Sequence, residues 1–212
     1  MVAMTWSEAA RYYNWLSEQE RIPEQEWCYL PNDDQRLDPE MRARENFIEL
    51  FGYQLPTEAK REFACQAEAK TPRFYRQSDS RLQKYAWYQA NTDNHTWPVG
   101  SLKPNDFGLF DMHGNVMKWC HDSLSNDPAE PTETPDDVPR NDPASESVPR
   151  ILSGGEFYNL PMNVRSPCRS SPISRANRIP IYNFRPCRSF EASGTPPAEA
   201  HSTTADRAKS GT

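Results

Sequence analysis

The side chains with the widest chemistry in this sequence are its five cysteines. A thiolate can attack an electrophile or bind a soft metal ion, and two thiols can join in a disulfide. The five are Cys28, Cys65, Cys120, Cys168 and Cys187. Their number is odd and no CxxC pair occurs, so their spacing matches no zinc-binding motif. We expect reduced thiols, with one or two disulfides as the alternative if the chain is exported.

Histidines are the other residues suited to proton transfer or metal binding. His95, His113 and His121 are dispersed over segments predicted as turns, and their spacing does not bring them together. His113 precedes Gly114 and suits a structural role, whereas His121 is predicted at the surface, where it and Asp122 orient each other. The sequence shows no nucleophile–base pair and no phosphate-binding glycine loop.

The overall charge excludes several classes of partner. The formal net charge is −6 at pH 7, which provides no electrostatic footprint for DNA or RNA and no basic patch for an anionic membrane. The sequence has no apolar run of about 18 residues. Residues 1–16 also lack the basic start, apolar core and cleavage pattern of a signal peptide. We therefore predict a cytoplasmic protein that binds neither nucleic acid nor membranes.

Two helices with clear starting signals would position the reactive side chains. The first is predicted over residues 6–20, where Thr5 and Glu8 form a capping box and apolar residues recur at helical spacing. The second is predicted in LPTEAKREFACQA, residues 55–67, with Thr57 as its cap. These are the only segments in which a helical period is clear.

Turns and short strands are predicted for most of the remaining ordered chain. Residues 85–120 are dense in aromatic residues, Asn and Gly, without helical periodicity. Three strand-like segments follow within residues 150–190, namely RILSGGEFY, NVRSPCRSS and YNFRPCRSF. The first of them is interrupted by a bend at Gly154–Gly155.

Two segments have compositions that disfavour packing. Residues 123–149 are acidic, rich in proline and nearly free of apolar side chains, so we expect an exposed, mobile loop within the domain. Residues 191–212 are polar and are predicted to form a disordered tail. The organisation expected is therefore one domain over residues 1–190, followed by that tail.

Five stretches of the sequence, in order, resemble the formylglycine-generating enzyme, or sulfatase-modifying factor, family. The resemblance covers residues 4–190 and is strongest from Pro98 to Cys120. The stretches are TWSEAARYYNWLS, YQLPTEAKREFACQA, YAWYQANTDNHTWPVGSLKPNDFGLFDMHGNVMKWC, RILSGGEFY and NFRPCRSF. The segment WCYLPNDD is similar to a subset found in bacterial multidomain proteins, some of which carry a protein kinase. The resemblance therefore implies a kinase-containing longer protein as the context of this domain.

The resemblance implies an α+β, C-type-lectin-like fold with two helices, short strands and much irregular structure. This agrees with the elements predicted from the residues themselves. Family members usually begin with strands that precede the first helix by some tens of residues. Here the predicted helix starts soon after Met1, so we expect those N-terminal strands to be missing.

The activity of this family depends on a pair of cysteines. Active formylglycine-generating enzymes use O₂, copper and two of their own thiolates to oxidise a cysteine of a sulfatase. The second thiolate follows an arginine that matches Arg165, which places the pair at Pro161 and Ser166 in this sequence. Neither is a cysteine, so no catalytic residue and no copper site are expected. Cys168 and Cys187 are the candidate substitutes, although a shift of two strand residues moves a sulfur by about 7 Å.

A second family site is a calcium site in the motif that matches GNVMKW. An Asn side chain, a backbone carbonyl and a Glu commonly hold the ion there. The matching positions are Asn115, Val116 and Lys118. An ammonium group repels a divalent cation, so we expect a degenerate calcium site, and a structural role for Asn115 in the turn after Gly114. Copper or calcium is expected only if these sites are rebuilt from other residues.

Three functions are compatible with the resemblance. The first is a non-catalytic recognition or regulatory module that binds a protein or carbohydrate ligand. The second is a copper- and O₂-dependent oxidoreductase of the formylglycine-generating type, which modifies a cysteine of a protein substrate. The third is a truncated, degenerate fragment. The loss of the cysteine pair and of the calcium carboxylate favours the first.

Overall fold

A computed structural model describes residues 3–30, 41–69, 79–123, 149–169, 173–174 and 176–189. The segment predicted as a mobile acidic loop lies outside the described residues except at its ends, and the predicted tail lies outside them entirely. The elements in chain order are α1 (Trp6–Gln19), η1 (Glu24–Glu26), β1 (Tyr53–Gln54), α2 (Glu58–Gln66), α3 (Asp79–Leu82), β2 (Ala86–Trp87), β3 (His113–Gly114), β4 (Met117–Ser123), β5 (Pro149–Ser153), η2 (Pro161–Asn163), β6 (Ile173–Ser174), β7 (Tyr182–Asn183) and β8 (Cys187–Arg188).

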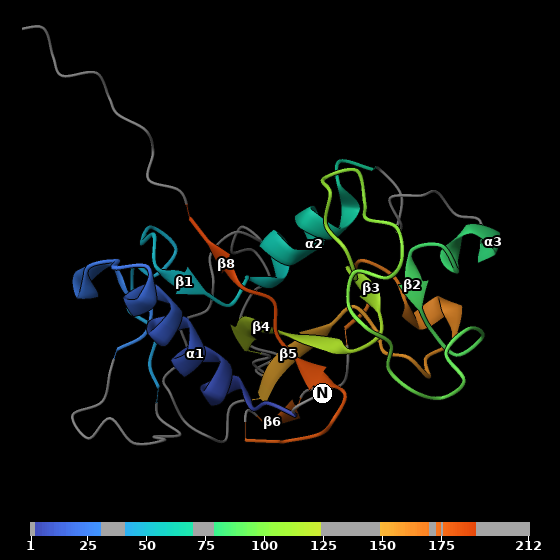
Figure 1. The fold of residues 1–212 in the computed structure, drawn as a ribbon. Coiled ribbons are helices and arrows are strands. Elements are labelled where there is room, and N and C mark those ends of the chain that lie inside the picture. The colour runs from blue at the N-terminus through green and yellow to red at the C-terminus, as the bar shows by residue number, and fades with distance from the viewer. Residues whose placement is uncertain are drawn as a thin grey trace, which may run out of the picture.

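A four-stranded sheet occupies the centre of the molecule, with α1 on one side and α3, β2 and β3 on the other (Figure 1). Its strand order is β6-β5-β4-β7. Strands β4 and β5 are antiparallel, with Trp119 opposite Leu152, whereas β7 runs parallel to β4. Two further pairs, β1 with β8 and β2 with β3, attach the outer segments. None of the helices in the described ranges has the length and apolar character to cross a membrane.

The strand expected in NVRSPCRSS is wrong. Over residues 163–169, the part of this segment that the structure describes, Asn163 ends the 3₁₀ turn η2 (Pro161–Asn163), and a single antiparallel bridge joins Arg169 to Ser153 of β5. Pro161 fixes the backbone at the start of the turn, and Pro167 has no N–H to donate to a neighbouring strand. The other two expected strands form as β5 and as the short strands β7 and β8.

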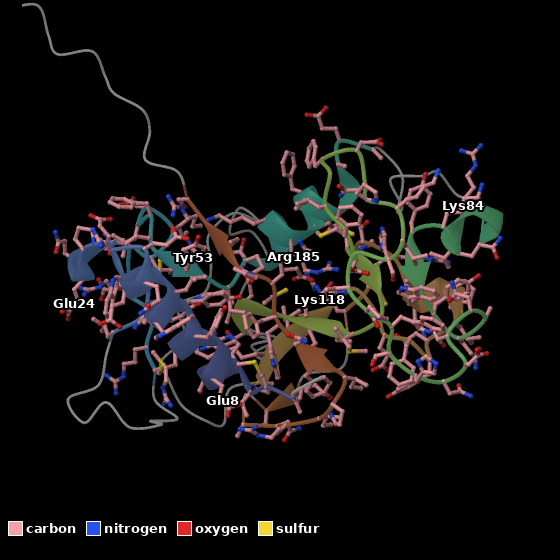
Figure 2. All side chains as sticks on the ribbon, viewed as in Figure 1. Glu8, Glu24, Tyr53, Lys84, Lys118 and Arg185 are labelled. Carbon is pink, nitrogen blue, oxygen red and sulfur yellow. The ribbon has the colours of Figure 1, made fainter. Side chains whose placement is uncertain are left out.

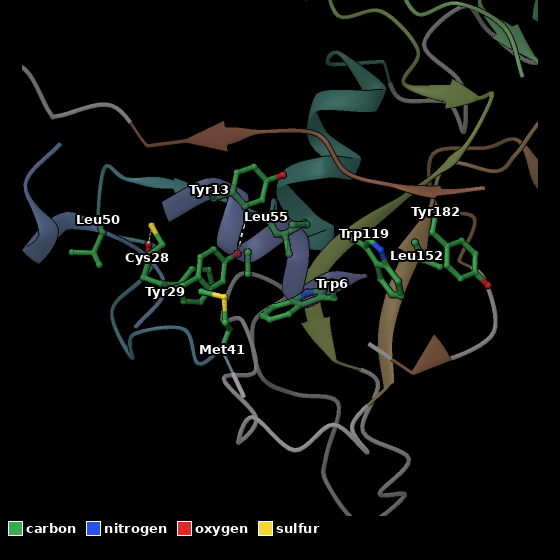
Figure 3. Packing of buried hydrophobic residues seen from close by; sticks show 13 residues of the cluster. Trp6, Tyr13, Cys28, Tyr29, Met41, Leu50, Leu55, Trp119, Leu152 and Tyr182 are labelled. Atoms are coloured by element: carbon green, nitrogen blue, oxygen red, sulfur yellow. Dashed lines mark hydrogen bonds between the residues drawn. The ribbon is translucent and has the colours of Figure 1, made fainter. Parts of the chain in front are cut away.

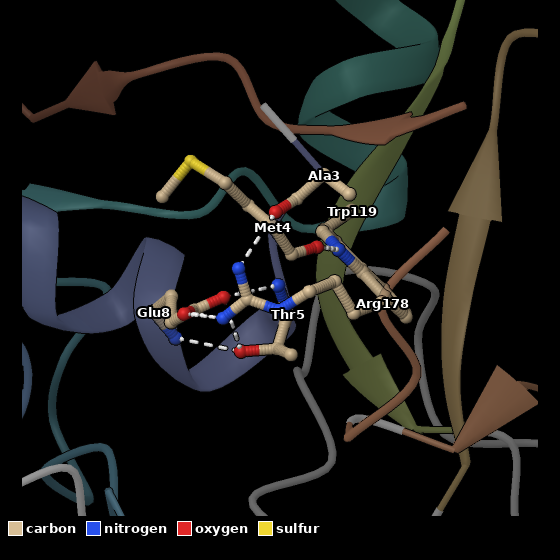
Figure 4. A network of polar contacts seen from close by, with 6 residues as sticks. All are labelled: Ala3, Met4, Thr5, Glu8, Trp119 and Arg178. Carbon is tan, nitrogen blue, oxygen red and sulfur yellow. Dashed lines mark hydrogen bonds and ion pairs between the residues drawn. The ribbon is translucent and has the colours of Figure 1, made fainter. Parts of the chain in front are cut away.

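The start of α1 is confirmed and is tied to two distant segments (Figure 4). The hydroxyl of Thr5 accepts the Glu8 N–H at 3.1 Å, and the Glu8 carboxylate accepts the Thr5 N–H at 2.8 Å. Arg178 forms an ion pair with the same carboxylate. The Trp119 indole of β4 donates to the Met4 carbonyl at 2.9 Å. The helix start is therefore held both by its local cap and by contacts from far along the chain.

Large rings between α1, the segment after it and the central sheet form the main core (Figure 3). Trp6 meets Tyr29 edge to face at a centroid distance of 5.7 Å, and Trp119 meets Tyr182 at 5.4 Å. Such contacts are worth about 1 kcal/mol each beyond the area they bury. The buried residues of this core are Trp6, Ala9, Ala10, Tyr13, Cys28, Tyr29, Met41, Phe47, Leu50, Leu55, Trp119, Leu152 and Tyr182.

The predicted surface position of His121 is wrong. Its ring is 1% exposed and stacks on Phe47 with the centroids 3.8 Å apart. Neither ring nitrogen has a hydrogen-bond partner among the described residues, and burial lowers the pKa of His121 well below its usual value. Asp122 instead accepts the Glu58 N–H at the start of α2. Both faces of β4 are covered. The pattern of polar and apolar residues along this strand therefore does not indicate which side chains are exposed.

We expect a His121→Leu variant to be more stable than the native chain, by about 1–2 kcal/mol, since leucine leaves no buried polar atom unpaired. The stability advantage of His121→Leu over the native chain should increase as the pH falls. The folded pKa of His121 is lowered, so below about pH 6.5 the unfolded state binds an extra proton and native stability falls. Urea unfolding at a series of pH values measures both effects. His95→Leu, at an exposed position, is the control, and an unchanged acid slope in His121→Leu would contradict the assignment.

Candidate functional site

The motif GNVMKW forms a tight turn between β3 and β4. Gly114 and Asn115 both have positive φ angles, 70° and 62°. The Asn115 N–H donates to the Trp87 carbonyl of β2 at 2.8 Å. A Cβ at Gly114 would lie 2.1 Å from the same carbonyl oxygen. The close approach of two backbones therefore requires glycine at this position.

The side chain of Asn115 is fully engaged within the protein. Its Oδ1 accepts the Trp97 N–H at 3.1 Å, and its Nδ2 donates to the Trp97 carbonyl at 2.9 Å. Trp97 in turn stacks on Trp87, with the centroids 4.6 Å apart and the rings inclined by 9°. Asn115 thus joins the 92–98 loop to the turn, as its expected structural role requires.

Lys118 points its ammonium group back into the same turn. The side chain is buried, and Nζ donates to the Gly114 carbonyl at 2.9 Å. Burial, reinforced by the charges of Arg61 and Arg185 (Figure 2), lowers the pKa of Lys118 to about 7. The Val116 N–H donates to the Gly114 carbonyl as well, at 2.8 Å. An ammonium group at the position of the family's Glu, and an Asn115 amide that already bonds to Trp97, do not fit a calcium ion, which needs several free oxygen ligands.

Arg61 is the second buried cation of this region. From α2 its guanidinium donates to the Ser153 hydroxyl at 2.9 Å and to the Met112 carbonyl at 2.8 Å. A Cβ at Gly154 would lie 2.3 Å from the guanidinium, so the glycine bend after β5 makes room for it. Arg61 therefore joins α2, β5 and the loop before β3.

The two positions that match the family cysteines lie in different surroundings. Pro161 begins η2 and is partly exposed. Ser166 is buried, and its hydroxyl donates to the Cys65 sulfur at 3.4 Å. The same sulfur lies 3.4 Å from Nε2 of His113. The folded chain thus assembles a Cys65–His113–Ser166 cluster that was not expected from the sequence.

The Cys65–His113–Ser166 cluster combines a thiol with a possible base, which is the composition of a nucleophilic site. Each of its three residues is at most 1% exposed, so the surface gives a substrate no access to the thiol. In this structure the thiol of the cluster is therefore closed off from the surface. Its members are 48 and 101 positions apart in the chain, and no local motif signals that they meet.

Cys168 and Cys187 contact different strands. The Cys168 carbonyl accepts the Ser153 hydroxyl of β5 at 3.0 Å, whereas the Cys187 thiol donates to the Gln54 carbonyl of β1 at 3.3 Å. Burial raises the pKa of both thiols, to about 12 for Cys187. All five cysteines are free, so the structure does not contain the disulfides considered as an alternative.

Comparison with known sequences gives one matching family and several relatives. The family described as the sulfatase-modifying factor enzyme 1-like domain matches residues 1–187. "Chaperone protein LppX" of Paenibacillus barcinonensis is 29% identical over 74% of this chain and 58% of its own length. "Serine/threonine-protein kinase pkn1" of Chlamydia pneumoniae is 32% identical over 56% of this chain and 18% of its own. "Formylglycine-generating enzyme" of Thermomonospora curvata is 32% identical over 50% of this chain and 39% of its own.

Comparison with solved structures agrees with the sequence comparison. Treponema denticola variable protein 1 has a TM-score of 0.71 and 26% identity, and the match covers 89% of this chain and 71% of that one. The α+β formylglycine-generating-enzyme fold that the resemblance implied is therefore confirmed. The chain spans 58% of LppX and 18% of the pkn1 kinase.

Proposed function

Since the chain belongs to the family of sulfatase-modifying factor enzyme 1-like domains, we propose that it is a non-catalytic recognition or regulatory module of that family. The observation that carries the proposal is the chemistry at the matched cysteine positions. Pro161 and Ser166 offer no thiolate, whereas two sulfur ligands are what a Cu(I) ion selects. The thiol that Ser166 contacts belongs to Cys65, which is fully buried.

The turn around Lys118 supports the same proposal. Its buried ammonium on the Gly114 carbonyl takes the place of a calcium-binding carboxylate, and we propose that the calcium site is degenerate. Asn115 retains only its role in holding the turn to Trp97. The motif would then stabilise the fold without binding a metal ion.

An exposed aromatic pair, formed by one ring of α2 and one of the 101–112 loop, favours a protein ligand. Phe63 of α2 is 61% exposed and Phe107 is 42% exposed, and their rings lie 5.6 Å apart. Adjacent exposed aromatic rings are typical of protein interaction sites. The relative named as a kinase contains a region similar to this chain within a longer protein. We propose the same context here, with the domain recognising a ligand for a kinase-containing protein.

An oxidoreductase of the formylglycine-generating type is the second candidate function, and the relatives of that name favour it. It would require Cys168 and Cys187 to supply the thiolates. Their contacts with β5 and β1, respectively, and the raised pKa of each thiol oppose this.

Incubation with copper, O₂ and a cysteine peptide from a sulfatase separates the two functions. We expect mass spectrometry to find the peptide cysteine unchanged, and a Cu(I) titration to show no stoichiometric binding, because no pair of accessible thiolates is available. An active formylglycine-generating enzyme is the positive control. Formylglycine in the peptide, lost in a Cys168→Ser or Cys187→Ser variant, would overturn the non-catalytic assignment.

A further inference from the structure

We draw no further inference here: the strongest candidate, the surface patch of aromatic rings that Tyr12 and Trp15 of α1 form with Phe184, carries none because nothing in the described part of the structure shows what covers it.

Discussion

A Gly114→Ala variant is expected to lose more than about 4 kcal/mol of stability, a loss that few single substitutions reach. The added Cβ would lie 2.1 Å from the Trp87 carbonyl oxygen and 3.1 Å from the Trp87 nitrogen. Both are backbone atoms of β2, which pairs with β3 at this point. The backbone of one strand would have to move away, and the Asn115 hydrogen bond to Trp87 would break with it.

Gly108→Ala is the matched control for this prediction. Gly108 has a φ of +75°, close to the +70° of Gly114, but nothing lies within 4 Å of the position that an added methyl group would take. This variant should cost about 1–2 kcal/mol, the ordinary penalty for a left-handed alanine. Urea unfolding followed by circular dichroism measures both variants. Equal losses would show that the conformation of Gly114, and not its contact with Trp87, determines the effect.

The correctly predicted parts of the fold are specified by residues that lie close together in the sequence. The capping box of α1 lies within four consecutive residues, Thr5 to Glu8, and Thr57 caps α2 in the same short range. These interactions join neighbours in the sequence, so the residue types alone predict where each helix starts. The family resemblance then implied short strands with much irregular structure, whereas their order in the sheets follows only from the folded chain.

The parts that were missed depend on contacts between distant segments. Cys65 and Ser166 are 101 positions apart, and neither residue type predicts the other. The sequence predicts His121 at the surface beside Asp122, yet it packs against Phe47 in the core. Lys118 is predicted at the position of the family's calcium-binding Glu. That the charges of Arg61 and Arg185 act on it follows only from the folded chain.

Lys118→Met is the second substitution with a large expected effect, and its direction is stabilising. The pKa of Lys118 is lowered from 10.5 to about 7 in the folded protein, so folding must either bury a charge or release a proton. Methionine removes that cost and fills a similar volume. We expect a gain of the order of 3 kcal/mol at neutral pH, after allowance for the lost hydrogen bond to Gly114.

The pH dependence of this gain identifies its cause. Below about pH 7 both folded and unfolded states hold the proton, and the full cost of the buried charge is present. As the pH rises from about 7 towards 10.5, the folded state is neutral while the unfolded state still binds the proton, so the native protein gains stability and the cost disappears. The advantage of Lys118→Met should therefore shrink steadily over this range. Lys84→Met, at an exposed lysine, should show no such trend. A Lys118→Met variant that is less stable than the native protein at neutral pH would mean that the surroundings of the ammonium group stabilise it.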